Sequence, residues 1–305
     1  MIVIAAVVGV AVAAGFGAER RYGARAQRAG RLTLSALLYG LLPFITFFNI
    51  ARLHFDLALG AGLGLAVVAL ALAGGLAWLV ANRVLALSRP ATGSVIAAVI
   101  QPNTGYFGLP ATAALLGTGA LGAAVAFDTV VSLVALYLGA FGVGAIFGDR
   151  AGETPRERAT SFLLRNPPLI ALILGLLAPD ALAPDALLDL SRVLVFAVAP
   201  LGFFAVGVTL ASEAEEGALA FPPRLDRAVG LALVGRLLVA PALLLTLAVP
   251  LIALPDAYAV QIAMPSGING LVVAHAYGLD LRVSAAAIAW STAIVLAAAV
   301  VGSLP

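Results

Sequence analysis

The chain of 305 residues contains no cysteine and only two histidines. The absence of thiols excludes disulfides, iron–sulfur clusters and thiolate metal sites. Two histidines without cysteine are also too little material for a typical zinc site. We therefore expect neither a metal nor a cofactor, and any coupling ion to be a proton or sodium.

Motifs of catalysis are missing as well. No phosphate loop, dinucleotide fingerprint or nucleophile triad is visible, and the stretch Gly60–Gly64 lies inside an apolar run with no strand before it. Neither the paired acids of an intramembrane enzyme nor the appended soluble module of a receptor is evident. We therefore do not expect an enzyme. With a net charge of only +2, we do not expect a nucleic-acid partner either.

Charged residues make up only 10% of the chain, against about 25% in soluble domains. Hydrophobic residues make up 63%, and the mean hydropathy is +1.11. The sequence therefore predicts an all-α membrane protein, and its length allows about ten spans of ~20 residues. The expected spans are 1–18, 33–51, 57–82, 92–116, 119–147, 166–179, 189–211, 228–250, 256–276 and 283–303.

All basic residues are arginine, and their distribution predicts the orientation. Fourteen of the 17 fall in the loops after spans 1, 3, 5, 7 and 9, whereas the opposite loops hold Arg52 and Arg192 only. The positive-inside rule places the arginine-rich side in the cytoplasm, with both termini outside. The first apolar run has no basic residue before it, so we interpret it as a retained first span.

Two spans are interrupted by residues that helices avoid. Span 4 contains Pro102 and Gly105, and span 9 contains Pro265 and Gly267. In hydrocarbon such breaks survive only inside protein or beside a watery cavity, and paired breaks in two halves indicate a transport site. The polar residues at or beside the breaks are candidates for substrate binding: Gln101, Asn103, Thr104, Tyr106, Ser266 and Asn269. The alternative is that they only satisfy freed backbone carbonyls.

An offset of 163 residues superimposes the two halves. It aligns the two break prolines, and it places Ala123–Ser132 on Ala286–Val295. Five spans on each side of a central loop force opposite orientations, so we expect two inverted five-helix repeats. The expected units are 1–148, a cytoplasmic loop 149–165, and 166–305.

Two charged residues lie within spans. Asp128 is expected to face a cavity, pair statically or carry a coupling proton, because an unpaired carboxylate is costly in hydrocarbon. Arg236 is a candidate substrate-binding residue, with pairing to Asp128 or snorkelling as alternatives. His275 and His54 are interpreted as interfacial.

At this point the sequence resembles the auxin efflux carrier family in its bacterial form, within the wider fold of the sodium/bile acid symporters. The resemblance is carried in order by Pro102–Pro110, Pro200–Gly207, Arg236–Pro241 and Pro265–Tyr277. It implies that spans 4 and 9 cross at the centre. It also implies a scaffold of spans 1, 2, 6 and 7 that forms a homodimer, and a transport domain of spans 3–5 and 8–10 that moves like an elevator.

The function expected from these features is secondary transport of small organic anions such as carboxylates, with membrane lipid as the surrounding partner. The alternative is a cation/proton antiporter or a sodium-coupled symporter of the same fold. A cation antiporter usually needs several intramembrane acids, and Asp128 is the only one deep inside an expected span.

Overall fold

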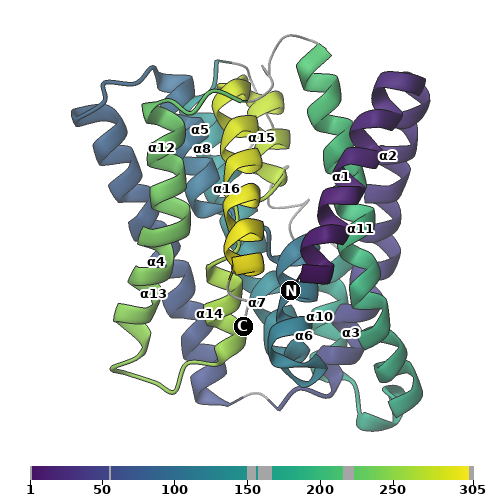
Figure 1. Cartoon of the computed structure of the whole chain (residues 1–305). Helices are drawn as coiled ribbons and strands as arrows, with labels where there is room; N and C mark the ends of the chain where they lie inside the picture. The colour runs from purple at the N-terminus through teal and green to yellow at the C-terminus, as the bar shows by residue number, and fades with distance from the viewer. Residues whose placement is uncertain (1, 55, 150–155, 157–166, 216–222, 302–305) are drawn as a thin grey trace.

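The computed structural model describes residues 2–54, 56–149, 156, 167–215 and 223–301, whose regular secondary structure is helical (Figure 1). The first half contains α1 (Ile2–Tyr22), α2 (Ala24–Ala36), η1 (Leu37–Leu41), α3 (Leu42–Ala51), α4 (Leu57–Arg83), α5 (Arg89–Ile100), η2 (Thr104–Gly108), α6 (Leu109–Leu116), η3 (Thr118–Ala120), α7 (Leu121–Phe127), η4 (Asp128–Ser132), η5 (Ala135–Ala140) and α8 (Phe141–Phe147). The second contains α10 (Pro167–Leu177), η6 (Asp180–Leu182), α11 (Asp185–Glu215), α12 (Arg227–Val234), η7 (Gly235–Val239), α13 (Ala240–Ala248), α14 (Asp256–Ile262), α15 (Asn269–Tyr277) and α16 (Leu281–Val301). The segments η3 and η6 are 3₁₀ turns, and the other η segments are π-helical.

Six helical stretches are long and apolar enough to cross a membrane: 24–51, 57–83, 118–147, 185–212, 227–248 and 281–299. The helices α5 and α10 are apolar but shorter. The chain is therefore a multi-pass membrane protein. Helix falls on each of the ranges expected from the sequence, while the count of ten membrane crossings stays a prediction.

The arginine-rich stretch after the first span, expected as a loop, is helical. Gly23 adopts φ +49°, which turns the chain between α1 and α2. The buried faces of Ala26 and Gly30 on α2 pack toward α11, whereas Arg25 and Arg28 are exposed. The periodic small residues explain why this polar stretch forms a packed helix.

The helices fall into two packed groups. In one, α1 and α2 lie against α11, and α3 packs on α10 and α11. In the other, α4 packs on α5 and α13, and α12 packs on α5 and α16. Figure 1 shows α1, α2 and α11 on the right and α4, α5, α12 and α13 on the left. The groups meet where α3 contacts α7 and where α11 contacts η2 and α6.

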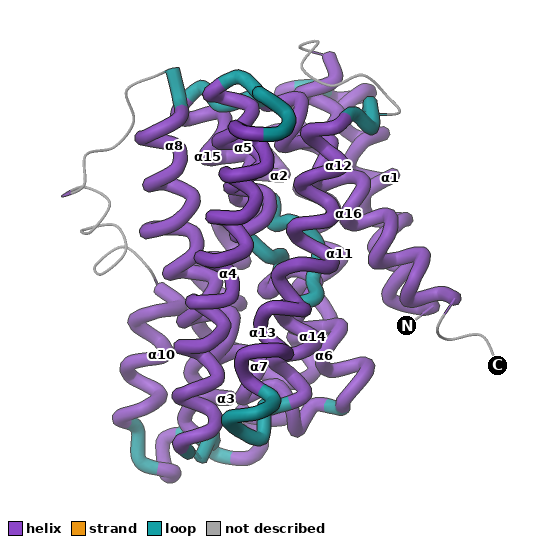
Figure 2. Tube along the Cα trace, turned by 90° about the vertical axis from the view of Figure 1, so that its left-hand side faces the viewer, coloured by secondary structure: helices purple, strands orange, loops and turns teal. Residues whose placement is uncertain are grey.

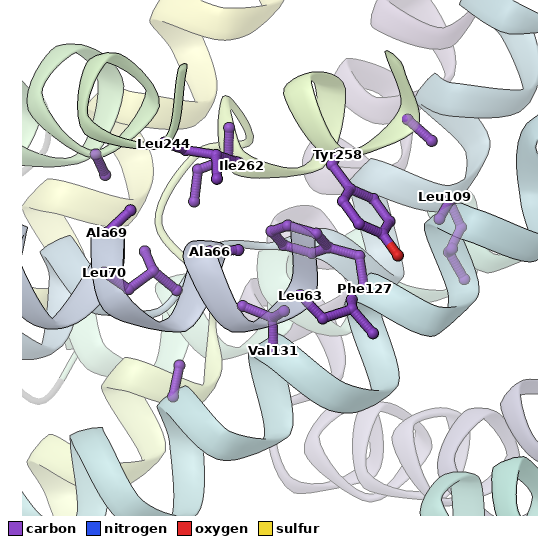
Figure 3. Packing of buried hydrophobic residues seen from close by; sticks show 14 of the residues in the cluster. Leu63, Ala66, Ala69, Leu70, Leu109, Phe127, Val131, Leu244, Tyr258 and Ile262 are labelled. Carbon is purple, nitrogen blue, oxygen red and sulfur yellow. The ribbon is translucent and has the colours of Figure 1, made fainter. Parts of the chain in front are cut away.

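The largest cluster of buried hydrophobic residues among the described residues includes much of α4 (Figure 3). Leu63 and Ala66 face Phe127 of α7 and Tyr258 of α14, and the two aromatic rings lie 5.3 Å apart. Small residues allow this approach: a Cβ added at Gly62 would lie 2.8 Å from the Tyr258 ring. Close packing through small residues is what stabilises helix pairs in lipid, where no hydrophobic force draws helices together.

Candidate functional site

The two expected breaks are present, and they pair with each other. The helix α5 ends at Ile100 and α14 ends at Ile262, and each is followed by irregular chain through its proline. Asn103 N donates to Pro265 O at 2.7 Å, and Gly267 N donates to Gln101 O at 2.6 Å. These two hydrogen bonds form an isolated antiparallel bridge between Pro102 and Ser266. Each break thus satisfies backbone groups that the other leaves free.

We call the place where the two breaks pair the crossing. It lies at mid-height inside the bundle, where Figure 2 shows irregular chain in teal among the helices. Glycine makes the approach possible, because a Cβ at Gly267 would lie 3.0 Å from Pro102 O. The chain resumes as η2 from Thr104 and as α15 from Asn269. The first turns of two helical segments therefore begin beside the bridge.

Asp128 reaches the first break from η4. Its Oδ1 accepts a hydrogen bond from Thr104 Oγ1, and the Thr104 hydroxyl also lies 2.6 Å from Ser132 Oγ. A Cβ at Gly105 would lie 3.3 Å from the same carboxylate oxygen. Asp128 also lines the cavity described next.

A cavity of about 80 Å³ lies at the crossing, and we call it the crossing cavity. Nine of the residues expected at the site line it: Gln101, Pro102, Asn103, Thr104, Gly105, Tyr106, Asp128, Gly267 and Asn269. Pro265, Ser266 and Arg236 are not among its lining residues. Ser266 instead donates its hydroxyl to Ala98 O at 2.9 Å and its N–H to Ser291 Oγ at 3.0 Å.

Sequence reasoning missed several lining residues. Thr129 and Ser132 belong to η4, as Asp128 does, and Leu38, Leu42 and Pro168 come from the other helix group. Ser132 follows Asp128 by four residues, so one helical turn along the span pointed to it. The apolar residues carried no such signal, because leucine is common throughout this chain.

A second cavity of about 580 Å³, which we call the vestibule, adjoins the first. The two share Leu38, Tyr106, Ile268 and Asn269. The vestibule runs between α2, α11 and α15, where Ser35, Thr209, Ser212 and His275 add polar atoms to a mostly apolar wall. The crossing cavity thus has a wider space on one side.

The comparisons with known proteins bear on this arrangement. A family model described as membrane transport protein matches residues 157–301. The match covers just under half of the chain and supports its assignment to this family. The assignment supports the resemblance to auxin efflux carriers, and the matched range includes the second break. No curated protein matches the chain.

In this membrane transport protein the helix termini set the electrostatics of the crossing. Thr104 and Asn269 begin helical segments and line the crossing cavity, so the first turns of both segments lie beside it. Such N-termini carry partial positive charge and favour an anion. The Oε1 atom of Gln101 is buried and has no hydrogen-bond partner among the described residues, so the site retains an unused acceptor.

Two of the placements considered for Arg236, snorkelling and pairing with Asp128, are not found in the structure, and contact with a substrate stays a prediction. The Arg236 side chain is fully buried, so it does not snorkel, and no ion pair joins it to Asp128 within the described part of the chain. Its Nη1 donates to Val99 O at 2.7 Å, and its Nη2 donates to Ile262 O. The acceptors are backbone carbonyls, which the side-chain pattern of the sequence could not reveal.

Proposed function

We propose that this membrane transport protein is a secondary transporter of small organic anions, and that a substrate carboxylate binds in the crossing cavity. The observation that carries the proposal is the pair of helical N-termini at Thr104 and Asn269, which open into one cavity beside the Asn103 side chain. Amide and hydroxyl donors together with helix dipoles bind a carboxylate without a cationic side chain.

Asp128 gives the proposed transport its coupling. It lines the same cavity of about 80 Å³, where a second ionised carboxylate would repel the substrate. The anion therefore binds when Asp128 carries a proton, and one proton accompanies one anion. The Thr104 and Ser132 hydroxyls stabilise the empty site by hydrogen bonding around the ionised carboxylate.

The packing supports an elevator-like movement. The helices α4–α8 and α12–α16 would carry the crossing past a scaffold of α1–α3, α10 and α11, which we expect to form a homodimer. The two helix groups approach each other closely at Gly202 of α11, where an added Cβ would lie 2.8 Å from the ring of Tyr106 in η2. Pairing of the two breaks is also what two inverted repeats would produce.

The position of the vestibule supports a proposal for the side on which the site is open. It follows α15 toward the α15–α16 loop, which lies at the same end as the α4–α5 loop and the start of α12 (Figure 1). These segments carry the arginines that the positive-inside rule assigns to the cytoplasm of a bacterial inner membrane. The structure would then be the inward-facing state, with both termini on the outer side.

A cation/proton antiporter or sodium-coupled symporter is the second candidate. The observation that favours it is the oxygen cluster of Asp128, Thr104 and Ser132, because hard cations bind oxygen ligands. Against it, no cluster of three acidic or histidine residues is found in the part of the chain that the structure describes.

The test is uptake of labelled mono- and dicarboxylates into proteoliposomes, under an imposed membrane potential and with separate pH and sodium gradients. Asn103→Ala should raise KM about tenfold to a hundredfold, the effect of losing a hydrogen bond worth about 1.5–3 kcal/mol to a charged group. Asn82→Ala is the matched control, because Asn82 is exposed and bonds only within its own helix, to Trp78 O.

Saturable uptake that Asn103→Ala weakens and Asn82→Ala preserves would support the anion site. Cation-driven proton movement without uptake of any carboxylate would reject it in favour of the antiporter.

A further inference from the structure

Arg236 is buried inside the protein, and no carboxylate among the described residues pairs with it. It lies in η7, and its side chain has no exposed surface. Its two hydrogen bonds go to Val99 O and Ile262 O, and its Nε has no partner among the described residues. A buried guanidinium is costly unless its charge is compensated, so the acceptors must supply that compensation.

The two acceptors occupy matching places in the two breaks. Val99 precedes Pro102 by three residues, and Ile262 precedes Pro265 by three residues. Each carbonyl belongs to the last turn of a half-helix, α5 or α14, where intrahelical partners are lacking and the dipole is negative. One side chain from a third span therefore joins the negative ends of both broken helices.

The approach of η7 to this point depends on Gly235. A Cβ there would lie 2.6 Å from Val99 Cγ2, so only glycine lets η7 come this close to α5. On the other side, the Ile262 side chain is packed with Leu244 in the central cluster (Figure 3). The surrounding packing thus holds both carbonyls at the guanidinium.

In transporters with broken helices, half-helix C-termini and unwound carbonyls commonly coordinate the coupling cation. We propose that Arg236 is a fixed cation at this carbonyl site, and that it makes anion transport independent of sodium at the crossing. The inference rests on the proposed function for its transport consequence. The occupancy of the carbonyl site by a positive charge stands on the geometry alone.

Arg236 acts as a positioning residue in this scheme. It does not line the crossing cavity, and it holds the C-terminal ends of α5 and α14 while the N-terminal starts of η2 and α15 receive the anion. Loss of the charge should leave two inward-pointing carbonyls that attract a free cation. A role in packing alone would create no such cation dependence.

The test uses Arg236→Gln, which keeps a hydrogen-bond donor but removes the charge, with Arg236→Lys as the control that keeps it. Thermal unfolding of the purified full chain is followed in sodium, and separately in low-millimolar methylguanidinium, against a bulky organic cation as background. Arg236→Gln should show a saturable rise in Tm of several degrees at about 100 times the cation Kd. Wild type and Arg236→Lys should show none.

The same variants are then compared in carboxylate uptake with and without sodium. Carboxylate uptake by Arg236→Gln should be about tenfold faster with sodium than without it, whereas uptake by wild type should be the same in both conditions. The inference is overturned if Arg236→Gln shows no cation dependence in Tm, or if wild type shows the same dependence. Absence of carboxylate uptake in wild type would reject the proposed function alone, because the unfolding measurement needs no substrate.

If Arg236→Gln does not fold, Arg236→Lys decides the matter. A folded lysine variant that is stable without sodium supports a requirement for positive charge at the carbonyls. A lysine variant that also fails to fold, while Arg236→Met folds without cation dependence, shows that only side-chain packing matters there.

Discussion

The two breaks share a backbone design but differ in chemistry. The first is contacted by a carboxylate, since Thr104 bonds to Asp128. The second is contacted by a hydroxyl, since Ser266 N donates to Ser291 Oγ. Asp128 and Ser291 are counterparts under the offset of 163 residues. The first break is therefore next to a carboxylate that can bind a proton, whereas the second break receives a neutral hydrogen bond.

The largest effect is expected from a variant that removes the ionisable group at the first break. Asp128→Asn mimics the permanently protonated site, so the anion should still bind and equilibrate. A pH gradient should no longer drive its accumulation, because the proton has no carrier. Measured as uptake after an acid-outside pH jump, gradient-driven accumulation should fall to the level seen without a gradient.

Ser291→Ala is the matched change in the second half. It removes the hydroxyl at Ser266 N but no charge, so pH-driven accumulation should persist. Equal loss of pH-driven accumulation in both variants would show that the halves are functionally alike.

An intermediate effect is expected from the glycines of the breaks. Gly267→Ala places a methyl group against Pro102 O and should destabilise the fold by about 1–3 kcal/mol, as overpacking does. Gly105→Ala instead places its methyl group 3.3 Å from Asp128 Oδ1, so it should alter transport more than stability. Thermal unfolding and uptake kinetics, measured on both variants, separate these effects.

Gly270→Ala is the control, because a Cβ there meets nothing within 4 Å. Its Tm should be unchanged or slightly higher, since alanine favours helix over glycine. A Tm loss for Gly270→Ala as large as for Gly267→Ala would refute the close approach at the bridge.

The smallest effect lies outside the membrane-spanning segments, at Asp226. Burial alone would raise the pKa of this carboxyl, but hydrogen bonds from Val229 N and Arg282 bring it below its usual value. A lowered pKa stabilises the fold above the unfolded value and loses that contribution as pH falls through the folded value. The Tm should therefore drop slightly below about pH 4.

Asp226→Asn should flatten this part of the pH profile. The group is well solvated, so the whole effect should stay within about 1 kcal/mol. An unchanged profile in Asp226→Asn would assign the acid sensitivity to other carboxyls.

Much of the fold followed from the sequence, because apolar length and proline–glycine interruptions are local signals. The positions of Pro102 and Pro265 located both ends of the bridge. The arginine-rich stretch after α1 was expected as a loop, since its small buried residues Ala26 and Gly30 are a weak signal beside so many charges.

The site was predicted less completely. Four of the polar residues singled out in the sequence line one cavity: Asn103, Thr104, Asp128 and Asn269. They could be singled out because polar residues are rare inside the expected spans. The role of Arg236 could not be predicted, because its partners are main-chain carbonyls and every residue has one. Apolar lining residues such as Leu133 were equally hidden.

The bridge between Asn103, Pro265, Gly267 and Gln101 has a consequence for the order in which the chain becomes stable in the membrane. A chain that ended before Pro265 would leave the Asn103 N–H and the Gln101 carbonyl unpaired in hydrocarbon, at a cost of several kcal/mol each. The first break therefore depends on a segment that is synthesised more than 150 residues later.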